Sequence, residues 1–272
     1  MGDPIDRVDL LCVIIWTGFT GSIEPQKWVR PILIRSRMEA RRFMANGWLM
    51  ALATVWLIGA AAGTARSDGD IALPDPRLSG PLSLEETLAT RRSVRRFTAA
   101  PLTLSDLGQM LWAAQGVTDP RGRRTAPSAG ALYPLELYVM AARVRDLAPG
   151  VYRYRADGHA LVPVAAGDRA PAVAAAAFNQ DWMREAAAIA VFTGVVARTA
   201  RKYRRRAEFY VHAEVGHAAM NLSLQALGLG LGSTMVGGFP PARIGEILGL
   251  PEDHEPMLMV PFGHPRPGKN RR

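Results

Sequence analysis

A cluster of arginines lies just after residue 90, where Arg91, Arg92 and Arg95 stand close together with Ser93 among them. Guanidinium groups present paired donors that match the oxygens of a phosphate, and a nearby hydroxyl adds one more donor. A solvated arginine-rich loop and a nucleic-acid patch have the same composition. Taken alone, the cluster indicates a site for anions without specifying the anion.

A loop of small residues begins at Pro127, Ser128, Ala129 and Gly130. Such a loop lets a flat ring system approach the backbone, which larger side chains prevent. The plain alternative is a turn that leads into a strand. A nucleophilic role for Ser128 is disfavoured, because the residues around it lack the glycine-x-serine-x-glycine pattern of a nucleophile elbow.

A second glycine-containing loop spans residues 231–239 and includes Val236, Gly237 and Gly238. Its backbone N–H groups could face the heteroatoms of a ring, but it lacks the GxGxxG fingerprint, so a Rossmann fold is not expected. The basic tail contains Lys269 and Arg271, whose cations could close on a phosphate. A disordered basic tail explains the same residues.

The elements that must position these loops can be read from caps and hydrophobic spacing. Ser83 and Glu86 have the spacing of a capping box ahead of a helix over 84–90. A second helix, capped by Thr103 or Ser105, is expected to end at Gly116. Strands are expected over 137–142, 151–154, 161–164, 188–194, 231–236 and 257–263, and further helices over 170–178, 210–227 and 241–248. Because helices and strands alternate without a strict βαβ period, the predicted fold class is α+β.

The composition limits the partners and the redox groups that the chain can use. The chain has 272 residues, of which 49% are hydrophobic, and a net charge of +9, which suggests an anionic partner. Cys12 is the single cysteine, so a disulfide framework and a CxxC redox pair are excluded, and any redox chemistry needs a bound cofactor. No metal site is expected, because His212 and His217 are five residues apart and fall on different sides of a helix.

The first sixty-odd residues differ from the rest of the chain. Basic residues precede an uncharged apolar run over 48–63, and small residues follow, with cleavage expected near Ala62 or Ala65. That order is typical of a secretory signal, and a retained membrane anchor is the alternative. We therefore expect an N-terminal extension with a signal or anchor over 1–65, a linker over 66–82 and a catalytic domain over 83–272. The expected location is periplasmic or membrane-anchored, and cytoplasmic if the signal does not function.

The order of the motifs resembles the FMN-dependent nitroreductase superfamily over about residues 83–266. The resemblance rests on Arg-Arg-Ser-x-Arg-x-Phe, on Pro-Ser-Ala-Gly-Ala-x-Tyr-Pro, on a long helix with Glu214, Gly216, His217 and Asn221, and on Gly-x-Gly-Ser-x-x-x-Gly-Gly-Phe. The loop over 128–134 and the pair Lys202-Tyr203 are similar to the SagB-type branch, which includes dehydrogenases that oxidise thiazolines and oxazolines to azoles.

The resemblance implies a nitroreductase-like fold, with a central and mainly antiparallel sheet flanked by helices, and a homodimer with two FMN sites at the subunit interface. It implies that the phosphate and ribityl chain are held by Arg91, Arg92, Ser93 and Arg95. It also implies that the ring is lined by Pro127, Ser128, Ala129, Gly130, Val236, Gly237 and Gly238, and that Lys269 or Arg271 adds a tail cation. Lys202 or Tyr203 would act as the general base, although the surrounding arginines also fit a solvated helix face.

Three functions follow from these observations. The first is a SagB-type dehydrogenase that passes hydride between FMN and a small molecule or a modified peptide. The second is a general nitro or quinone reductase that uses NAD(P)H, a donor that a periplasmic location disfavours. The third is a basic, non-catalytic protein that binds nucleic acid or a membrane surface, and it predicts a colourless protein with strongly salt-dependent binding.

Overall fold

A seven-stranded antiparallel sheet forms the centre of the part of the chain that the structure describes. This computed structural model describes residues 69–268, which belong to one compact unit, Ala62–Arg272. The expected signal over 1–65 and the tail residues Lys269 and Arg271 lie outside the described residues.

The strands are β1 (Ile71–Ala72), β2 (Leu135–Ala141), β3 (Gly150–Arg155), β4 (Ala160–Ala166), β5 (Ala188–Gly194), β6 (Gly232–Ser233) and β7 (Glu255–Gly263). Their order across the sheet is β1-β4-β3-β2-β5-β7-β6, and every neighbouring pair is antiparallel. The predicted α+β class and the mainly antiparallel sheet are therefore confirmed.

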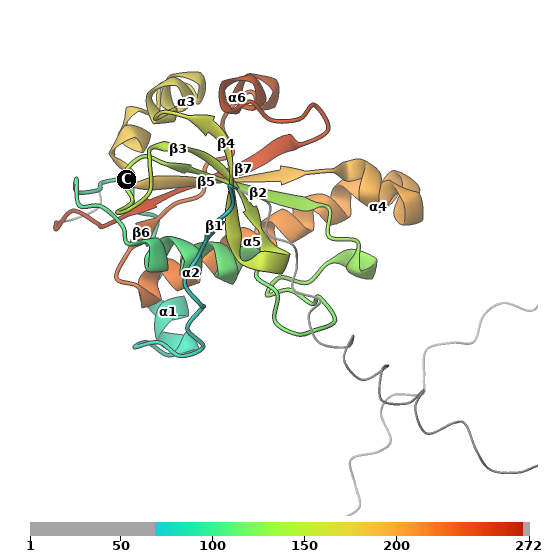
Figure 1. The fold of residues 1–272 in the computed structure, drawn as a ribbon, viewed down its shortest axis with the longest axis horizontal. Helices are drawn as coiled ribbons and strands as arrows, with labels where there is room; N and C mark the ends of the chain where they lie inside the picture. Colours follow the sequence, from blue (N-terminus) through green and yellow to red (C-terminus); the bar gives the residue numbers. More distant parts are fainter. Residues whose placement is uncertain (1–68, 269–272) are drawn as a thin grey trace, which may run out of the picture. The chain divides into compact units, whose positions relative to one another are not determined.

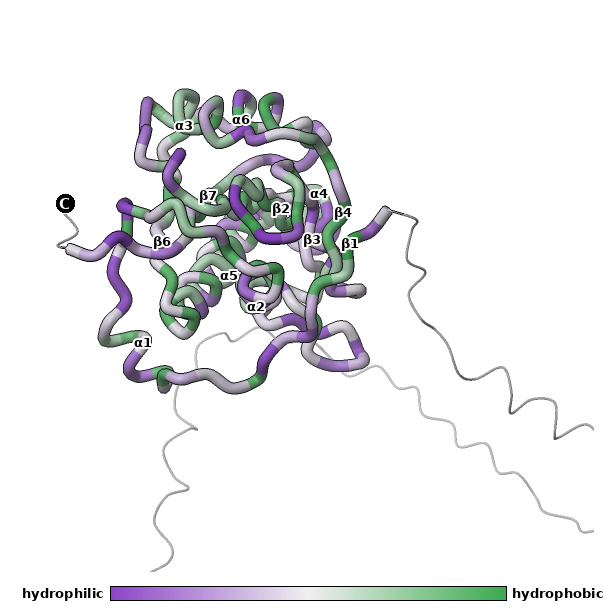
Figure 2. The backbone as a smooth tube through the Cα atoms, turned by 60° about the vertical axis from the view of Figure 1, so that its left-hand side comes forward, coloured by the Kyte–Doolittle hydropathy of each residue, from purple (hydrophilic) through white to green (hydrophobic). Residues whose placement is uncertain are grey.

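Helices cover both faces of the sheet (Figure 1). On one face lie α1 (Leu84–Thr90), α2 (Leu104–Gln115) and α5 (Ala207–Gly228), and on the other lie α3 (Ala170–Ala176) and α6 (Pro241–Leu248). Figure 2 shows the same three layers from another direction. The helix α4 (Val196–Tyr203) extends from the end of β5, and short 3-10 turns lie at Ala129–Ala131, Ala156–Gly158, Asp181–Glu185 and Arg204–Arg206.

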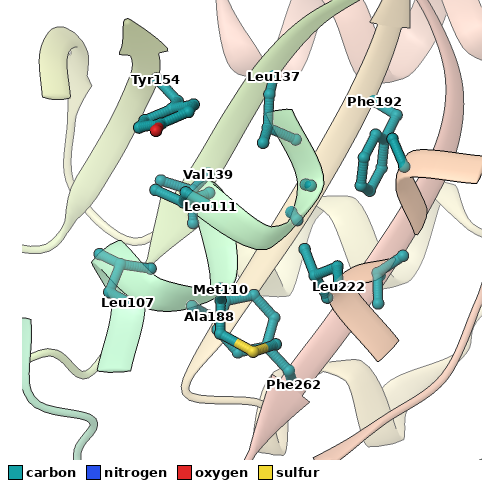
Figure 3. Close-up of a cluster of buried hydrophobic side chains, with 14 of the residues drawn as sticks. Leu107, Met110, Leu111, Leu137, Val139, Tyr154, Ala188, Phe192, Leu222 and Phe262 are labelled. Atoms are coloured by element: carbon teal, nitrogen blue, oxygen red, sulfur yellow. The ribbon is translucent and has the colours of Figure 1, made fainter. Parts of the chain in front are cut away.

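The larger part of the core lies between the sheet and the pair α2 and α5. Figure 3 shows its side chains meeting from both layers, among them Leu111, Leu222, Phe192 and Phe262. Each of these four is fully buried, and full burial of such a side chain contributes about 1.5–3 kcal/mol. A second cluster fills the space under α3 and α6. Because both faces are covered, β5 is buried at all of its positions and reads as a continuous apolar run.

Local sequence determines where the helices begin and end. Ser83 and Glu86 form the predicted capping box of α1, and Thr103 forms a second one with Asp106 at the start of α2. The helix α6 ends at Gly249, whose φ of 69° is in the left-handed region. Among the residues of known placement, no helix has both the length and the apolar character needed to cross a membrane.

Two segments differ from the expected pattern. Ile71–Ala72, within the segment expected to be a linker, pairs with β4 and adds an edge strand to the sheet. The strand expected over 231–236 is reduced to Gly232–Ser233, followed by a single bridge between Val236 and Met259. Beyond Val236 the chain leaves the ladder, so the backbone groups of Gly237 and Gly238 do not pair in the sheet.

Candidate active site

The loop before β2 has an unusual backbone. Gly130 has a φ of 63°, and two non-glycine residues, Ala131 and Tyr133, have φ values of 54° and 45°. Left-handed backbone costs a residue with a Cβ roughly 1–2 kcal/mol. Such conformations persist only where surrounding contacts fix them, and they concentrate at functional sites.

The helix α5 supplies contacts that fix this loop. The backbone N–H of Ala129 donates to Glu214 Oε1 at 2.8 Å, and the hydroxyl of Ser128 also donates to that carboxylate. Ser128 Oγ in turn accepts a hydrogen bond from the N–H of Tyr133 at 2.8 Å. Burial raises the pKa of Glu214, and the two hydrogen bonds oppose this shift in part. A second side chain of α5, Asn221, donates to the carbonyl of Thr125 at 3.2 Å.

Lys202 and Tyr203, at the end of α4, lie directly against the loop. A Cβ added at Gly130 would lie 2.9 Å from Lys202 Nζ and 3.1 Å from the hydroxyl oxygen of Tyr203. The ring of Tyr203 packs on Tyr210 of α5 with 4.7 Å between the ring centroids. The structure therefore brings the two residues expected to move a proton to the loop expected to line a ring.

The arginine cluster lies beside β6, an edge strand of the sheet. Ser93 forms a bridge with Ser233 of β6, and Arg95 lies 5.9 Å from the centroid of the Trp182 ring. Arg92 donates to the carbonyl of Ala89 at 3.1 Å and to the carbonyl of Arg91 at 2.8 Å. Within residues 69–268, no carboxylate lies within 4.0 Å of the guanidinium groups of Arg91, Arg92 and Arg95. These cations are therefore available to an anionic ligand.

The second glycine loop presents open backbone. Val236 is buried and exchanges two hydrogen bonds with Met259, whereas Gly237 and Gly238 are exposed. A Cβ added at Gly237 would meet nothing nearer than a carbon of Leu258 at 3.9 Å. A ligand could approach this backbone closely, as the sequence predicts.

Within one chain, the arginine cluster and the loop with Gly130 lie at opposite ends of β7, and Val236 bridges to Met259 between them. Ser93 bridges to Ser233, which pairs with Phe262 at the end of β7. The loop that holds Gly130 precedes β2, whose first residue pairs with Gly194, and Gly194 pairs with the first residue of β7. At about 3.3 Å per residue, the length of β7 separates the two groups by roughly 23 Å. Figure 1 shows the separation, with β6 and α4 on opposite sides of the view.

From the sequence, Glu214 was expected only as part of the long helix and was not predicted to be a site residue. It is 95% buried, since its exposed fraction is 5%, and it belongs to the side of α5 that packs into the protein. The available signal was a single carboxylate inside the otherwise apolar series Val211, Val215, Ala218 and Leu222. A buried carboxylate requires donors, and here the loop before β2 provides them.

The model of the nitroreductase family matches residues 88–264. The chain belongs to the nitroreductase family. Two proteins that carry the name "putative nitroreductase" resemble this nitroreductase. One, from Methanocaldococcus jannaschii, is 42% identical over 194 residues, which is 71% of this chain and 96% of the relative. The other, of known crystal structure, comes from Ralstonia eutropha and is 32% identical with a TM-score of 0.65, covering 76% of this chain and 94% of its own.

A third structure shows likeness of fold alone. The Escherichia coli microcin synthetase McbBCD complex, solved with truncated pro-MccB17 bound, is 21% identical with a TM-score of 0.55. The match covers 84% of this nitroreductase and 85% of that chain.

This nitroreductase is an FMN-dependent oxidoreductase. Its residues fit the cofactor. The guanidinium groups of Arg91, Arg92 and Arg95, which have no carboxylate partner within residues 69–268, have the chemistry that a phosphate requires. The open backbone at Gly237 leaves room for a ring to approach. The alternative of a non-catalytic binding protein is therefore excluded, because the chain belongs to a family of oxidoreductases.

Proposed function

We propose that this nitroreductase is a dehydrogenase of the SagB type, in which Lys202 and Tyr203 transfer the proton. The observation that carries the proposal is the position of both polar groups at Gly130, in the loop Pro127, Ser128, Ala129 and Gly130. The substrate class is an azoline ring in a small molecule or a modified peptide.

Oxidation of an azoline removes two hydrogens from neighbouring ring atoms, one as a hydride and one as a proton, and leaves a new double bond. FMN, when bound, supplies the acceptor for the hydride. The protein must therefore provide a base for the proton at the same place. Lys202 Nζ and the Tyr203 hydroxyl converge on one point, because both lie close to the position that a Cβ of Gly130 would occupy. Geometry of this kind is the first requirement for a general base.

We propose that two copies of the chain complete each site. Arg91, Arg92, Ser93 and Arg95 of one copy would hold the phosphate, and Val236, Gly237 and Gly238 would face the ring. The loop with Gly130 would come from the second copy, because roughly 23 Å separates the two groups in one chain. Exposed apolar side chains on α1 and α5 support such an interface: Leu84 is 60% exposed, Leu88 57% and Met220 40%. Lys269 and Arg271 stay candidates for a tail cation.

Single variants test the base. In the FMN-loaded protein, Lys202→Met and Tyr203→Phe are expected to slow the reduction of FMN by a thiazoline or oxazoline probe by about 100-fold or more, the size typical of a lost general base. Both variants should keep the FMN content of the wild type. Unchanged rates in both variants, with the probe active on the wild type, would show that the pair does not transfer the proton.

The second candidate is a nitro or quinone reductase that uses NAD(P)H. It is favoured by the Methanocaldococcus jannaschii relative, which covers nearly all of its own length with 42% identity and carries a nitroreductase name. Anaerobic mixing with NADPH and NADH separates the candidates. Rapid bleaching of FMN by either nucleotide, without bleaching by an azoline, would establish this reductase.

We also propose that the chain is exported, on the basis of the apolar run over 48–63 and the small residues that follow it. Fractionation of cells that express the full chain tests this proposal. Recovery in the periplasm with an N-terminus near residue 63 or 66 is the expected result.

A further inference from the structure

A cavity of about 360 Å³ lies where β2 begins and β3 ends, next to the loop that contains Gly130. Sites for small molecules have volumes of about 300–1,000 Å³, so the cavity admits a small ligand. Its wall carries three guanidinium groups, those of Arg124, Arg153 and Arg155, and two carboxylates. The balance of these charges decides what the cavity can bind.

Glu136, one of the two carboxylates, is neutralised by arginines. Its oxygens lie 2.6 Å from a nitrogen of Arg198 and 4.0 Å from a nitrogen of Arg153. Arg198 lies outside the cavity wall and one helical turn before Lys202 on α4. It also donates to the carbonyl of Tyr133 at 3.2 Å. The same network thus touches the cavity and the loop of the candidate active site.

Arg155 is also paired with carboxylates. It pairs with Asp70, and its Nε lies 3.8 Å from the carboxylate of Asp157, the second acid of the wall. Its Nε and one terminal nitrogen are buried and have no hydrogen-bond partner among residues 69–268. They pack against Gly158, where an added Cβ would lie 2.9 Å from that terminal nitrogen. The charge of Arg155 is therefore compensated by two carboxylates, whereas its buried Nε and second terminal nitrogen lack an acceptor among residues 69–268.

Arg124 is different. Within residues 69–268 no carboxylate lies within 4.0 Å of it, and the hydrogen bond it donates there runs from Nη1 to Gln115 Oε1 at 2.9 Å. Its guanidinium carbon lies 4.6 Å from the centroid of the Tyr133 ring, a cation–π arrangement that fixes its orientation. Burial lowers the pKa of Arg124, because the charge is partly removed from water. A partly buried cation that lacks a carboxylate partner favours an anionic ligand.

We propose that Arg124 forms an anion subsite in this cavity and binds the carboxylate of a small organic ligand. The wall has one cation more than it has acids, which matches the single charge of a carboxylate. A phosphate monoester carries about −1.5 to −2 at neutral pH and would leave excess negative charge beside Glu136 and Asp157. Insofar as the ligand is the substrate, the subsite rests on the proposed function, because Tyr133 connects it to the loop that faces Lys202.

Calorimetric titration of the oxidised, FMN-loaded protein with para-nitrobenzoate tests the subsite, and para-nitrobenzyl alcohol is the neutral probe of similar size. Arg124→Gln is expected to weaken the binding of para-nitrobenzoate by about 10- to 100-fold, the range for a lost charge-assisted hydrogen bond. Binding of the alcohol should not change. The matched control is Arg121→Gln, in the same loop, because Arg121 is exposed, pairs with Asp119 at 3.2 Å and lies outside the wall.

An equal loss of both probes in Arg124→Gln would overturn the proposal, because it would indicate a general change of shape. So would equal binding of para-nitrobenzoate by the variant and the wild type, or preference of the wild type for inorganic phosphate over para-nitrobenzoate. The outcome of this titration is independent of the proton-transfer test. Lys202→Met can leave the rate unchanged while Arg124→Gln still loses the carboxylate, and the reverse result is equally distinguishable.

Discussion

The backbone N–H of Ala129 donates to Glu214 Oε1 at 2.8 Å, and so a carboxylate in the middle of α5 holds the small-residue loop before β2. The loop contains left-handed residues that do not adopt their backbone conformation without support. Glu214 is thus a positioning residue: it touches the loop, and the loop faces Lys202 and Tyr203.

Replacement of Glu214 should loosen the loop. Glu214→Ala leaves the N–H of Ala129 without its acceptor, and we expect a loss of about 1–3 kcal/mol in the free energy of unfolding together with weaker FMN binding. Glu214→Gln keeps a carbonyl acceptor and should retain more of both. Urea unfolding and fluorescence titration with FMN measure the two effects. If Glu214→Ala binds FMN as tightly as the wild type, the loop does not depend on this carboxylate.

Glu214 also predicts a pH dependence. Burial raises its pKa above the usual value of 4.5, so the folded chain binds this proton more tightly than the unfolded chain does. The contribution to stability is fully present below the unfolded pKa and is lost as the pH rises through the folded pKa. Between wild type and Glu214→Gln, the difference in free energy of unfolding should therefore change with pH in the range just above 4.5. A difference that is constant across this range contradicts the assignment.

Gly130 tests the contact with Lys202 and Tyr203. In Gly130→Ala the new methyl group would lie 2.9 Å from Lys202 Nζ, so the lysine must move. We expect a loss of about 1 kcal/mol in stability from the left-handed backbone and a lower kcat at unchanged FMN content. Gly122→Ala is the control, because Gly122 has a φ of 76° and nothing within 4 Å of the added Cβ. Equal kinetics in the two variants would remove the contact as an explanation.

The arginines after α1 should determine FMN affinity. Arg91→Gln, Arg92→Gln and Arg95→Gln are each expected to raise the dissociation constant of FMN by about 10-fold or more, because each removes a charge-assisted donor. Arg243→Gln is the control, since Arg243 is exposed and pairs with Glu246 at 2.7 Å. Ultrafiltration followed by measurement of retained FMN separates the variants. Retention equal to that of the control in all three would place the phosphate elsewhere.

Much of the fold could be predicted from local chemistry. The Ser83 capping box, the apolar run Ala188–Gly194 and the glycine that ends α6 each depend on neighbours in sequence, and each was found where expected. The strand Ile71–Ala72 was missed, because two residues carry no periodicity and their pairing with β4 is a contact between distant segments.

The site shows the same limit. Residue types indicated which loops could hold a cofactor, but not how they are arranged in space. The contact of Lys202 with Gly130 depends on the placement of α4 beside the loop. The separation of Ser93 from Gly130 follows from strand order. Neither can be obtained from spacing along the chain, since both depend on the assembled sheet.

The placement of the two groups at opposite ends of β7 has a consequence for the colour of the protein. If each FMN is held by one copy's arginines and the other copy's loop, then the cofactor binds only where two chains meet, and cofactor and subunit association are thermodynamically linked. A solution that is yellow when concentrated would release its flavin on dilution, and added FMN would draw separated chains together.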